Sequence, residues 1–310
     1  MKTIRFILGS ILFVAFFSTV SMAQNGRTFV SGGGLDTNPC SVTSPCRTFG
    51  QAISVTNAGG EVIVLTSAGY GPFTITKAVT VEAPAGVYAG VTVSSGNGIT
   101  INATAGVDTV TLRGLTVNNQ GSTGNGIVFN TGGTLHVESC IANGFSSGGG
   151  IDIAGPGNIF VDDTIARGNT YGILANIPTT GTASISMVNL HSDANTYGLF
   201  LEAAATGVIV NAAIRSSSAS GNTTTGMLVE GVTNGVASLD IESCLVTDNG
   251  TGVFAQGITS GTGTASISNC TITRNSTSGF DQESGGVINS RGQNTIIGSN
   301  TGNLTALPGQ

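Results

Sequence analysis

Two short motifs recur in step along most of this 310-residue chain, and their period restricts the possible folds. In the first motif a glycine precedes an apolar residue, at Gly98, Gly126, Gly150, Gly172, Gly198, Gly226, Gly252 and Gly279. The last two residues of the second motif are a small polar residue and then a small or apolar one. They are clearest at Ser139-Cys140, Ser243-Cys244 and Asn269-Cys270. A period of about 25 residues predicts stacked repeats. A β-sandwich would not keep two markers in phase, and the spacing of leucine-rich repeats is absent.

Each period contains short segments in which apolar and polar residues alternate, separated by Gly, Asn and Ser. This alternation predicts strands with one buried face. One such coil cannot bury its inner face alone, whereas stacked coils align like residues into a continuous core. Asn, Asp or Ser often precedes the cysteine position, which suits a tight bend. We therefore expect one all-β solenoid of nine or ten coils, with a buried column of Ile127, Ile151, Ile173, Leu199, Met227 and Val253.

The second motif is looser in some periods. We align Leu112–Leu115, Val161–Thr164, Met187–Leu190 and Val210–Ala213 with it. That alignment predicts an outward column of Arg113, Glu138, Asp162, Val188, Asn211, Glu242 and Ser268. We expect Arg113 and Glu138 to form a surface ion pair, which contributes less than about 1 kcal/mol.

The segment Ile267-Ser268-Asn269-Cys270 and the repeated glycine-apolar starts resemble the right-handed parallel β-helix repeats of the pectate-lyase-like (pectin lyase fold) superfamily, of the secreted bacterial kind. The N-terminal series, including Ser44-Pro45-Cys46 and Gln51-Ala52-Ile53, resembles the same group. The resemblance covers about residues 28 to 300. It implies a right-handed parallel β-helix with a short capping helix. It is specific for the fold and weak for activity, because the superfamily includes lyases, hydrolases, epimerases and adhesins.

The ends of the chain differ from the coils. Residues 1–23 form a positive start, an apolar run and small residues before a cleavage point, which predicts a secretory signal peptide. We expect an N-terminal cap over 24–60, coils over 61–286, and a C-terminal cap and tail over 287–310. In the cap, Ser44-Pro45 is the expected helix start, and Phe49, Ala52 and Ile53 form one covering face.

Composition limits the partners. Only 8% of residues are charged and the formal charge is −6, which excludes electrostatic binding of nucleic acid or anionic membranes. The predicted location is secreted, either extracellular or periplasmic, with no membrane span after signal removal. Cys40 and Cys46 then favour a local disulfide, and Cys140, Cys244 and Cys270 are predicted buried thiols.

The outer face of the first strand in each coil carries the candidate site. One outward column contains four successive apolar residues, Leu174, Phe200, Leu228 and Phe254. The next contains Asn176, Glu202, Glu230 and Gln256. Phenylalanine rings can stack on sugars, while amides and carboxylates can hydrogen-bond hydroxyl groups. We expect glycan binding by Asn176, Phe200, Glu202, Leu228, Glu230, Phe254 and Gln256.

Other interpretations remain open at this point. Glu202 and Glu230 are the candidate catalytic pair of a glycoside hydrolase or polysaccharide lyase, since two close carboxylates have perturbed pKa values. A Ca²⁺ ion could bridge them, although we assign no cofactor and no metal site. The apolar strip could instead pair with another chain, as in an adhesin or matrix protein. It could also pack under the segments Ala203–Gly207 and Ile214–Thr225.

A polysaccharide lyase needs a base and a positive group beside the substrate carboxylate. The first-strand outer columns contain no Lys or Arg, and Arg167, Arg215 and Arg274 are the nearest candidates. The leading hypothesis is therefore a secreted carbohydrate-binding or scaffold protein, and an enzyme is the alternative.

Overall fold

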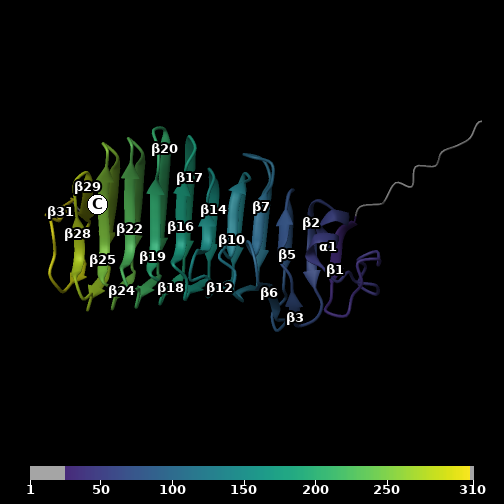
Figure 1. Ribbon diagram of the computed structural model, residues 1–310. Coiled ribbons are helices and arrows are strands. Elements are labelled where there is room, and N and C mark those ends of the chain that lie inside the picture. The colour runs from purple at the N-terminus through teal and green to yellow at the C-terminus, as the bar shows by residue number, and fades with distance from the viewer. Residues whose placement is uncertain (1–24, 308–310) are drawn as a thin grey trace, which may run out of the picture.

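The computed structural model describes residues 25–307 as a right-handed parallel β-helix, as the repeat predicts. The coils stack in chain order along one axis, from the purple N-terminal end to the yellow C-terminal end (Figure 1). The expected signal peptide, 1–23, lies outside the described residues. Each complete coil contributes one strand to each of three sheets, which we number in the order in which a coil enters them.

The first sheet has nine strands. In most coils its strand begins at or beside the glycine-apolar motif. Its strands are β4 (Phe73–Ile75), β7 (Ile99–Asn102), β10 (Ile127–Thr131), β13 (Gly149–Ile153), β16 (Tyr171–Ile177), β19 (Tyr197–Ala203), β22 (Thr225–Val232), β25 (Thr251–Ile258) and β28 (Ser278–Gln282).

The second sheet has twelve strands and packs against the first across the core. Its strands are β1 (Asn25–Val30), β2 (Thr56–Val64), β5 (Val79–Glu82), β8 (Thr109–Arg113), β11 (Thr134–Glu138), β14 (Gly157–Asp162), β17 (Gly181–Val188), β20 (Val208–Arg215), β23 (Val236–Glu242), β26 (Thr262–Ser268), β29 (Gly286–Ser290) and β31 (Thr305–Ala306). Because both sheets turn their apolar faces to one core, their outer faces point in opposite directions.

The third sheet is a narrow strip of ten mostly three-residue strands that joins the other two. It consists of β3 (Ala68–Tyr70), β6 (Ala89–Val93), β9 (Leu115–Asn119), β12 (Ile141–Asn143), β15 (Ile165–Arg167), β18 (His191–Asp193), β21 (Ser218–Ser220), β24 (Leu245–Thr247), β27 (Thr271–Thr273) and β30 (Thr295–Ile296).

The register confirms that residues one repeat apart are neighbours. Ile127 pairs with Ile151 and Ile173 with Leu199, and the whole predicted column is fully buried. Cys140, Cys244 and Cys270 are buried free thiols, also as predicted. The alternation of apolar and polar residues therefore fixes both the strand and the column in which each side chain lies.

The glycine of the first motif is required by close packing between coils. A Cβ atom at Gly226 would lie 2.7 Å from the carbonyl oxygen of Gly252 and 2.8 Å from the Asn249 Nδ2 atom. The motif glycines of the other coils up to Gly252 meet the next carbonyl in the same way. The marker thus records where one backbone lies directly against the next.

A ladder of buried asparagines runs beside these glycines, at the turn from the third sheet to the first. Its members are Asn169, Asn195, Asn222, Asn249 and Asn275. The backbone N–H of each of the first four donates to the side-chain oxygen of the next, at 2.9 to 3.0 Å. The ladder satisfies backbone groups that the turn would otherwise leave unpaired in the interior.

The turn from the second sheet to the third has one position with positive φ. Ser139, Asp163, Asn189, Ser216, Ser243 and Asn269 occupy it with φ of 49 to 53°. Asn and Asp tolerate this conformation better than most residues with a side chain. The expected bend before the cysteine column is therefore confirmed.

The predicted N-terminal cap contains both expected features. Cys40 and Cys46 form a disulfide, and helix α1 (Phe49–Val55) buries Phe49, Ala52 and Ile53 over the end of the core. The predicted helix start at Ser44-Pro45 is wrong. The N-cap is Thr48, whose hydroxyl accepts a hydrogen bond from the Gln51 N–H.

The alignment of Val210–Ala213 with the second motif is also wrong. Val188 pairs with Arg215, and Arg215 with Glu242, so Arg215 occupies the outward position predicted for Asn211. The true motif is four residues later, with Ser216 in the bend. A shift of four preserves the alternation of inward and outward residues, so the apolar pattern alone did not separate the two registers. The predicted pair of Arg113 and Glu138 is present, with Nε and Oε2 2.7 Å apart.

Candidate functional site

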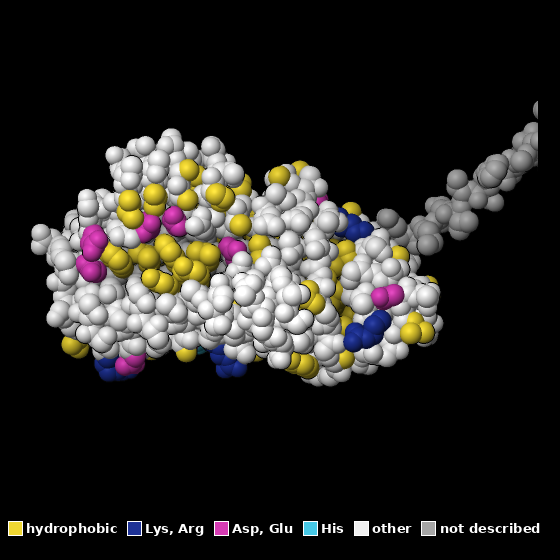
Figure 2. All heavy atoms as spheres, in the orientation of Figure 1, with side chains coloured by type: hydrophobic (Ala, Val, Ile, Leu, Met, Phe, Trp, Pro, Cys, Tyr) yellow, Lys and Arg dark blue, Asp and Glu magenta, His cyan; other side chains and the backbone are white. Residues whose placement is uncertain are grey.

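The predicted apolar column forms a strip across the first sheet. Leu174, Phe200, Leu228 and Phe254 occupy one register position on β16, β19, β22 and β25. Figure 2 shows an apolar strip on this face, with acidic side chains beside it and a ridge along one edge. We call these four residues the first-sheet strip.

The strip is only partly accessible. Leu174, Phe200 and Phe254 are half-buried, whereas Leu228 is 5% exposed. Within the segment 214–225, residues 214–215 belong to β20 and residues 218–220 to β21, so these residues lie in the other two sheets. Phe200 and Phe254 are half-buried, so both rings keep some contact with solvent.

Two tyrosines that the sequence interpretation missed extend the strip. Tyr171 and Tyr197 stack with ring centroids 5.4 Å apart, and both contact Phe200 at 5.6 and 5.7 Å. They follow Asn-Thr in two successive coils, as Asn169-Thr170-Tyr171 and Asn195-Thr196-Tyr197. This repeated Asn-Thr-Tyr-Gly sequence was the signal that could have found them. The result is a cluster of three aromatic rings on two adjacent coils.

The predicted polar column lies along one side of the strip. Asn176, Glu202, Glu230 and Gln256 occupy one register position on four adjacent coils. The Asn176 amide donates to Glu202 at 2.7 Å, and the Gln256 amide donates to Glu230. Each glutamate is therefore held by an amide on its outer side.

Burial raises the pKa of both glutamates, and the charge of Glu230 adds to the shift of Glu202. The hydrogen bond from Gln256 opposes the rise in the pKa of Glu230. The repulsion expected from adjacent carboxylates is thus present.

An aspartate stands beyond each end of the strip, at the same register position. Asp152 pairs with Leu174 and accepts a hydrogen bond from Asn125 at 2.7 Å. Burial raises the pKa of Asp152 to about 6. Asp281 pairs with Phe254, and its buried Oδ1 atom has no hydrogen-bond partner. The strip is therefore bounded by carboxylates on both ends and on one side.

The raised pKa of Asp152 predicts a pH-dependent stability. Between the usual carboxyl pKa near 4 and about 6, the folded protein binds more protons than the unfolded chain, so its stability falls as pH rises. Asp152→Asn should stabilise the protein at pH 7 by on the order of 1 to 2 kcal/mol, and hardly at pH 4. Urea unfolding at the two pH values measures this. Glu283→Gln, which removes an exposed carboxylate, is the control and should change stability little at either pH. An equal gain in stability for Asp152→Asn at both pH values would contradict the interpretation.

Within residues 25–307, no group of three or more His, Cys, Asp or Glu side chains is placed to hold a metal ion. Over the same range, no helix has the length and apolar character needed to cross a membrane.

The chain is similar in structure to solved proteins, but its sequence matches no protein family. No protein-family model matches the chain, and no curated protein matches it. Pectate lyase Pel9A superimposes with a TM-score of 0.52 and 16% identity, over 90% of this chain and 79% of that one. XylC in complex with xylose gives a TM-score of 0.59 and 10% identity, over 85% and 68%. The chain has the pectate-lyase-like β-helix fold. At these identities the likeness carries the fold alone.

Proposed function

We propose that this protein is secreted and binds a neutral polysaccharide along the first-sheet strip without cleaving it. The observation that carries this proposal is the joint arrangement of partly exposed aromatic rings and fixed polar groups. Phe200, Tyr171 and Tyr197 form one ring cluster, and amide–carboxylate pairs line its edge. Aromatic faces stack on the C–H faces of sugars, while carboxylates accept hydrogen bonds from sugar hydroxyl groups and side-chain amides both accept and donate them.

The length of the strip suits a short stretch of a polysaccharide. The outward positions from Leu174 to Phe254 span three coil steps, or about 14 Å at the parallel-strand spacing. The polar column runs parallel to the strip over the same four coils. A chain lying along the helix axis would meet an apolar surface beneath it and hydrogen-bonding groups beside it.

The position of the glutamates favours binding over hydrolysis. The carboxylates of a glycosidase flank the scissile bond, so that one protonates the leaving oxygen and the other acts from a different direction. Glu202 and Glu230 lie side by side in one column of one sheet, and would approach a sugar from the same side. Their amide partners hold them in that arrangement.

The charge of the site favours a neutral ligand. Strands β16, β19, β22 and β25 contain no Lys or Arg, while Asp152, Glu202, Glu230 and Asp281 surround the strip. Such a surface repels uronate polymers, and it lacks the positive group that a lyase needs beside the substrate carboxylate.

Two observations support secretion and a glycan partner. The Cys40–Cys46 disulfide is typical of an oxidising compartment. The structural neighbours include a pectate lyase and a protein in complex with xylose. The expected signal peptide at 1–23 agrees with this proposal.

Phe200→Ala should weaken the binding of soluble xylan about tenfold, because the variant loses the centre of the ring cluster and about 1.4 kcal/mol of contact. Affinity electrophoresis in gels containing xylan measures the effect. Glu283→Ala, in an exposed position near the end of the first sheet, is the control and should bind like the natural protein. Polygalacturonate should not retard the protein.

The alternatives give different results in the same experiments. If the natural protein released reducing or unsaturated sugars, and Glu202→Gln and Glu230→Gln did not, the proposed function would be catalysis and not binding. If the protein associated with itself in a concentration-dependent way, lost this association in Phe200→Asp and was retarded by no glycan, the proposed function would be assembly with another chain.

A further inference from the structure

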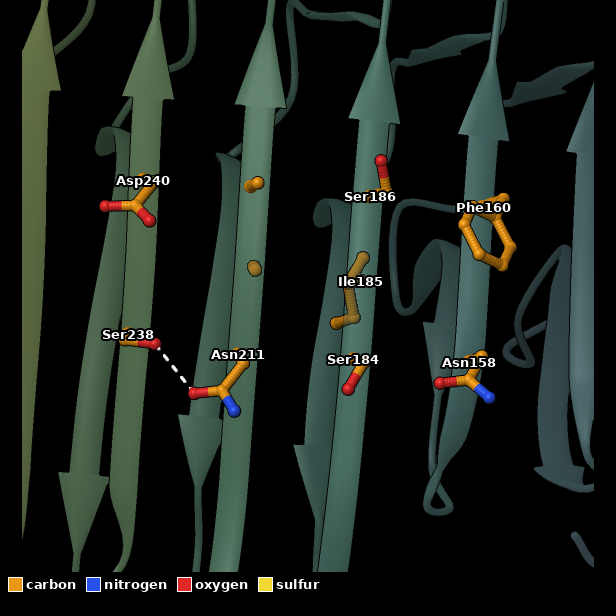
Figure 3. A pocket seen from close by; sticks show the side chains of 10 residues that line it. Asn158, Phe160, Ser184, Ile185, Ser186, Asn211, Ser238 and Asp240 are labelled. Atoms are coloured by element: carbon orange, nitrogen blue, oxygen red, sulfur yellow. Dashed lines mark hydrogen bonds between the residues drawn. The ribbon is translucent and has the colours of Figure 1, made fainter.

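The outer face of the second sheet contains a hollow that the proposed function does not use. It encloses about 410 Å³ over β14, β17, β20 and β23 (Figure 3). Its origin is the size of the side chains in one register column. Phe160 is followed on successive coils by Ser186 and Ala213, and then by Asp240. Two small residues between two larger ones leave a depression about two coils wide.

An aromatic ring stands at one edge of this hollow. Phe160 is 37% exposed, and Figure 3 shows its ring at one edge of the depression. His136 on the preceding coil stacks on it, with ring centroids 4.8 Å apart and planes 11° apart. This stacking holds the exposed ring in one orientation, so little side-chain entropy is lost when a ligand contacts it.

The adjacent column supplies uncharged hydrogen-bonding groups at every coil. Asn158, Ser184, Asn211 and Ser238 follow one another on the four strands. Asn211 and Ser238 are hydrogen-bonded to each other at 2.8 Å, which orders this side of the hollow. Asp240 is the one carboxylate of the lining, and Arg291 lies 3.3 Å from it. The lining is therefore polar and nearly neutral.

The hollow continues towards the N-terminal coils. A second depression of about 340 Å³ shares Asn158 and Ser184 with it, and is otherwise lined by small residues and by Val107 and Pro156. Together the two form a trough that runs from the turns before β8 and β11 onto the outer face of the second sheet. An extended chain of β-linked pyranoses repeats at a length close to the coil spacing of about 4.8 Å.

We infer that this trough is a second carbohydrate-binding site, for a neutral β-linked oligosaccharide whose ring stacks on Phe160. Because the first and second sheets face in opposite directions, a protein with both sites joins two polysaccharide chains. Such a protein acts as a cross-linker, and its avidity for an insoluble polymer exceeds the affinity of either site.

The test uses xylohexaose and cellohexaose as probes, with sites counted by isothermal titration calorimetry. The natural protein should bind two molecules of one of these probes. Phe160→Ala should remove one site. Ala213→Phe, which keeps Phe160 and fills the hollow, should remove the same site. The control Thr111→Ala, on the same sheet beyond the lining, should keep both sites.

Phe200→Ala separates this inference from the proposed function. Binding that weakens about tenfold at one site in Phe200→Ala, while the trough variants lose the other site, supports both. Binding that weakens in Phe200→Ala and is unchanged in both trough variants overturns the second site alone. Binding that is lost in the trough variants and unchanged in Phe200→Ala overturns the proposed function alone. Self-association that disappears in Ala213→Phe, with no sugar bound at the trough, assigns this face to a second copy and overturns the inference.

Discussion

Gly226→Ala is expected to destabilise the protein by about 3 kcal/mol, at the upper end of the range typical of overpacking in a closed interior. The new Cβ would lie 2.7 Å from the carbonyl oxygen of Gly252 and 2.8 Å from both the Asn249 amide and a Val246 methyl group. The first two contacts are with groups that hold adjacent coils together. The coils must therefore separate locally, which weakens the hydrogen bonds of several strands at once. Denaturant unfolding followed by far-ultraviolet circular dichroism measures the loss.

Gly71→Ala is the matched control. A Cβ at Gly71 would meet nothing within 4 Å, and its φ lies outside the left-handed region. Its replacement should leave the unfolding midpoint unchanged or raise it slightly, because alanine reduces the entropy of the unfolded chain. Equal effects of the two substitutions would show that the glycine motif does not mark a steric requirement.

Asn222→Ala should lower the free energy of unfolding by about 3 kcal/mol, because it breaks the asparagine ladder in the middle. The Asn222 side chain accepts the Asn195 N–H at 2.9 Å and donates to Asn249 and to the Ser192 carbonyl at 2.9 and 3.1 Å. Alanine leaves these groups buried without a partner. Unfolding in guanidinium, at constant m-value, gives the change in the free energy of unfolding.

Two other asparagine variants sharpen this prediction. Asn222→Asp keeps an acceptor for Asn195 but loses both donated hydrogen bonds and places a carboxylate in the interior, so it should be as harmful at pH 7 and milder at low pH. Asn158→Ala, at an exposed position on the second sheet, should change stability by less than about 0.5 kcal/mol. A small effect of Asn222→Ala would mean that water or a neighbouring coil replaces the ladder.

The motif glycines and the asparagine ladder explain how a chain with little charge and few aromatic residues keeps its coils in register. Both lie where the chain turns from the third sheet into the first. They fix the height of each coil relative to the next, and so they align the first-sheet strip and its polar column. The proposed sites therefore depend on the same packing as the fold.

Some predictions from the sequence were right because parallel stacking turns sequence spacing into proximity. Once the repeat length was known, Phe200 had to lie between Leu174 and Leu228, and Glu202 beside Glu230. The glycine and cysteine columns followed in the same way. The errors arose where the repeat was ambiguous. Asn211 was placed in the column of Arg215 because a four-residue shift keeps every apolar side chain inside.

The sequence by itself determined the fold and the columns, since the period of two along a strand and of about 25 along the chain decides which side chains stack. Only the tertiary structure decided how open each outer face is. The burial of Leu228, the exposure of Phe200 and the second-sheet hollow all depend on relative side-chain sizes on three or four coils at once. Accessibility is a property of that packed surface, and the alternation along a single strand does not contain it.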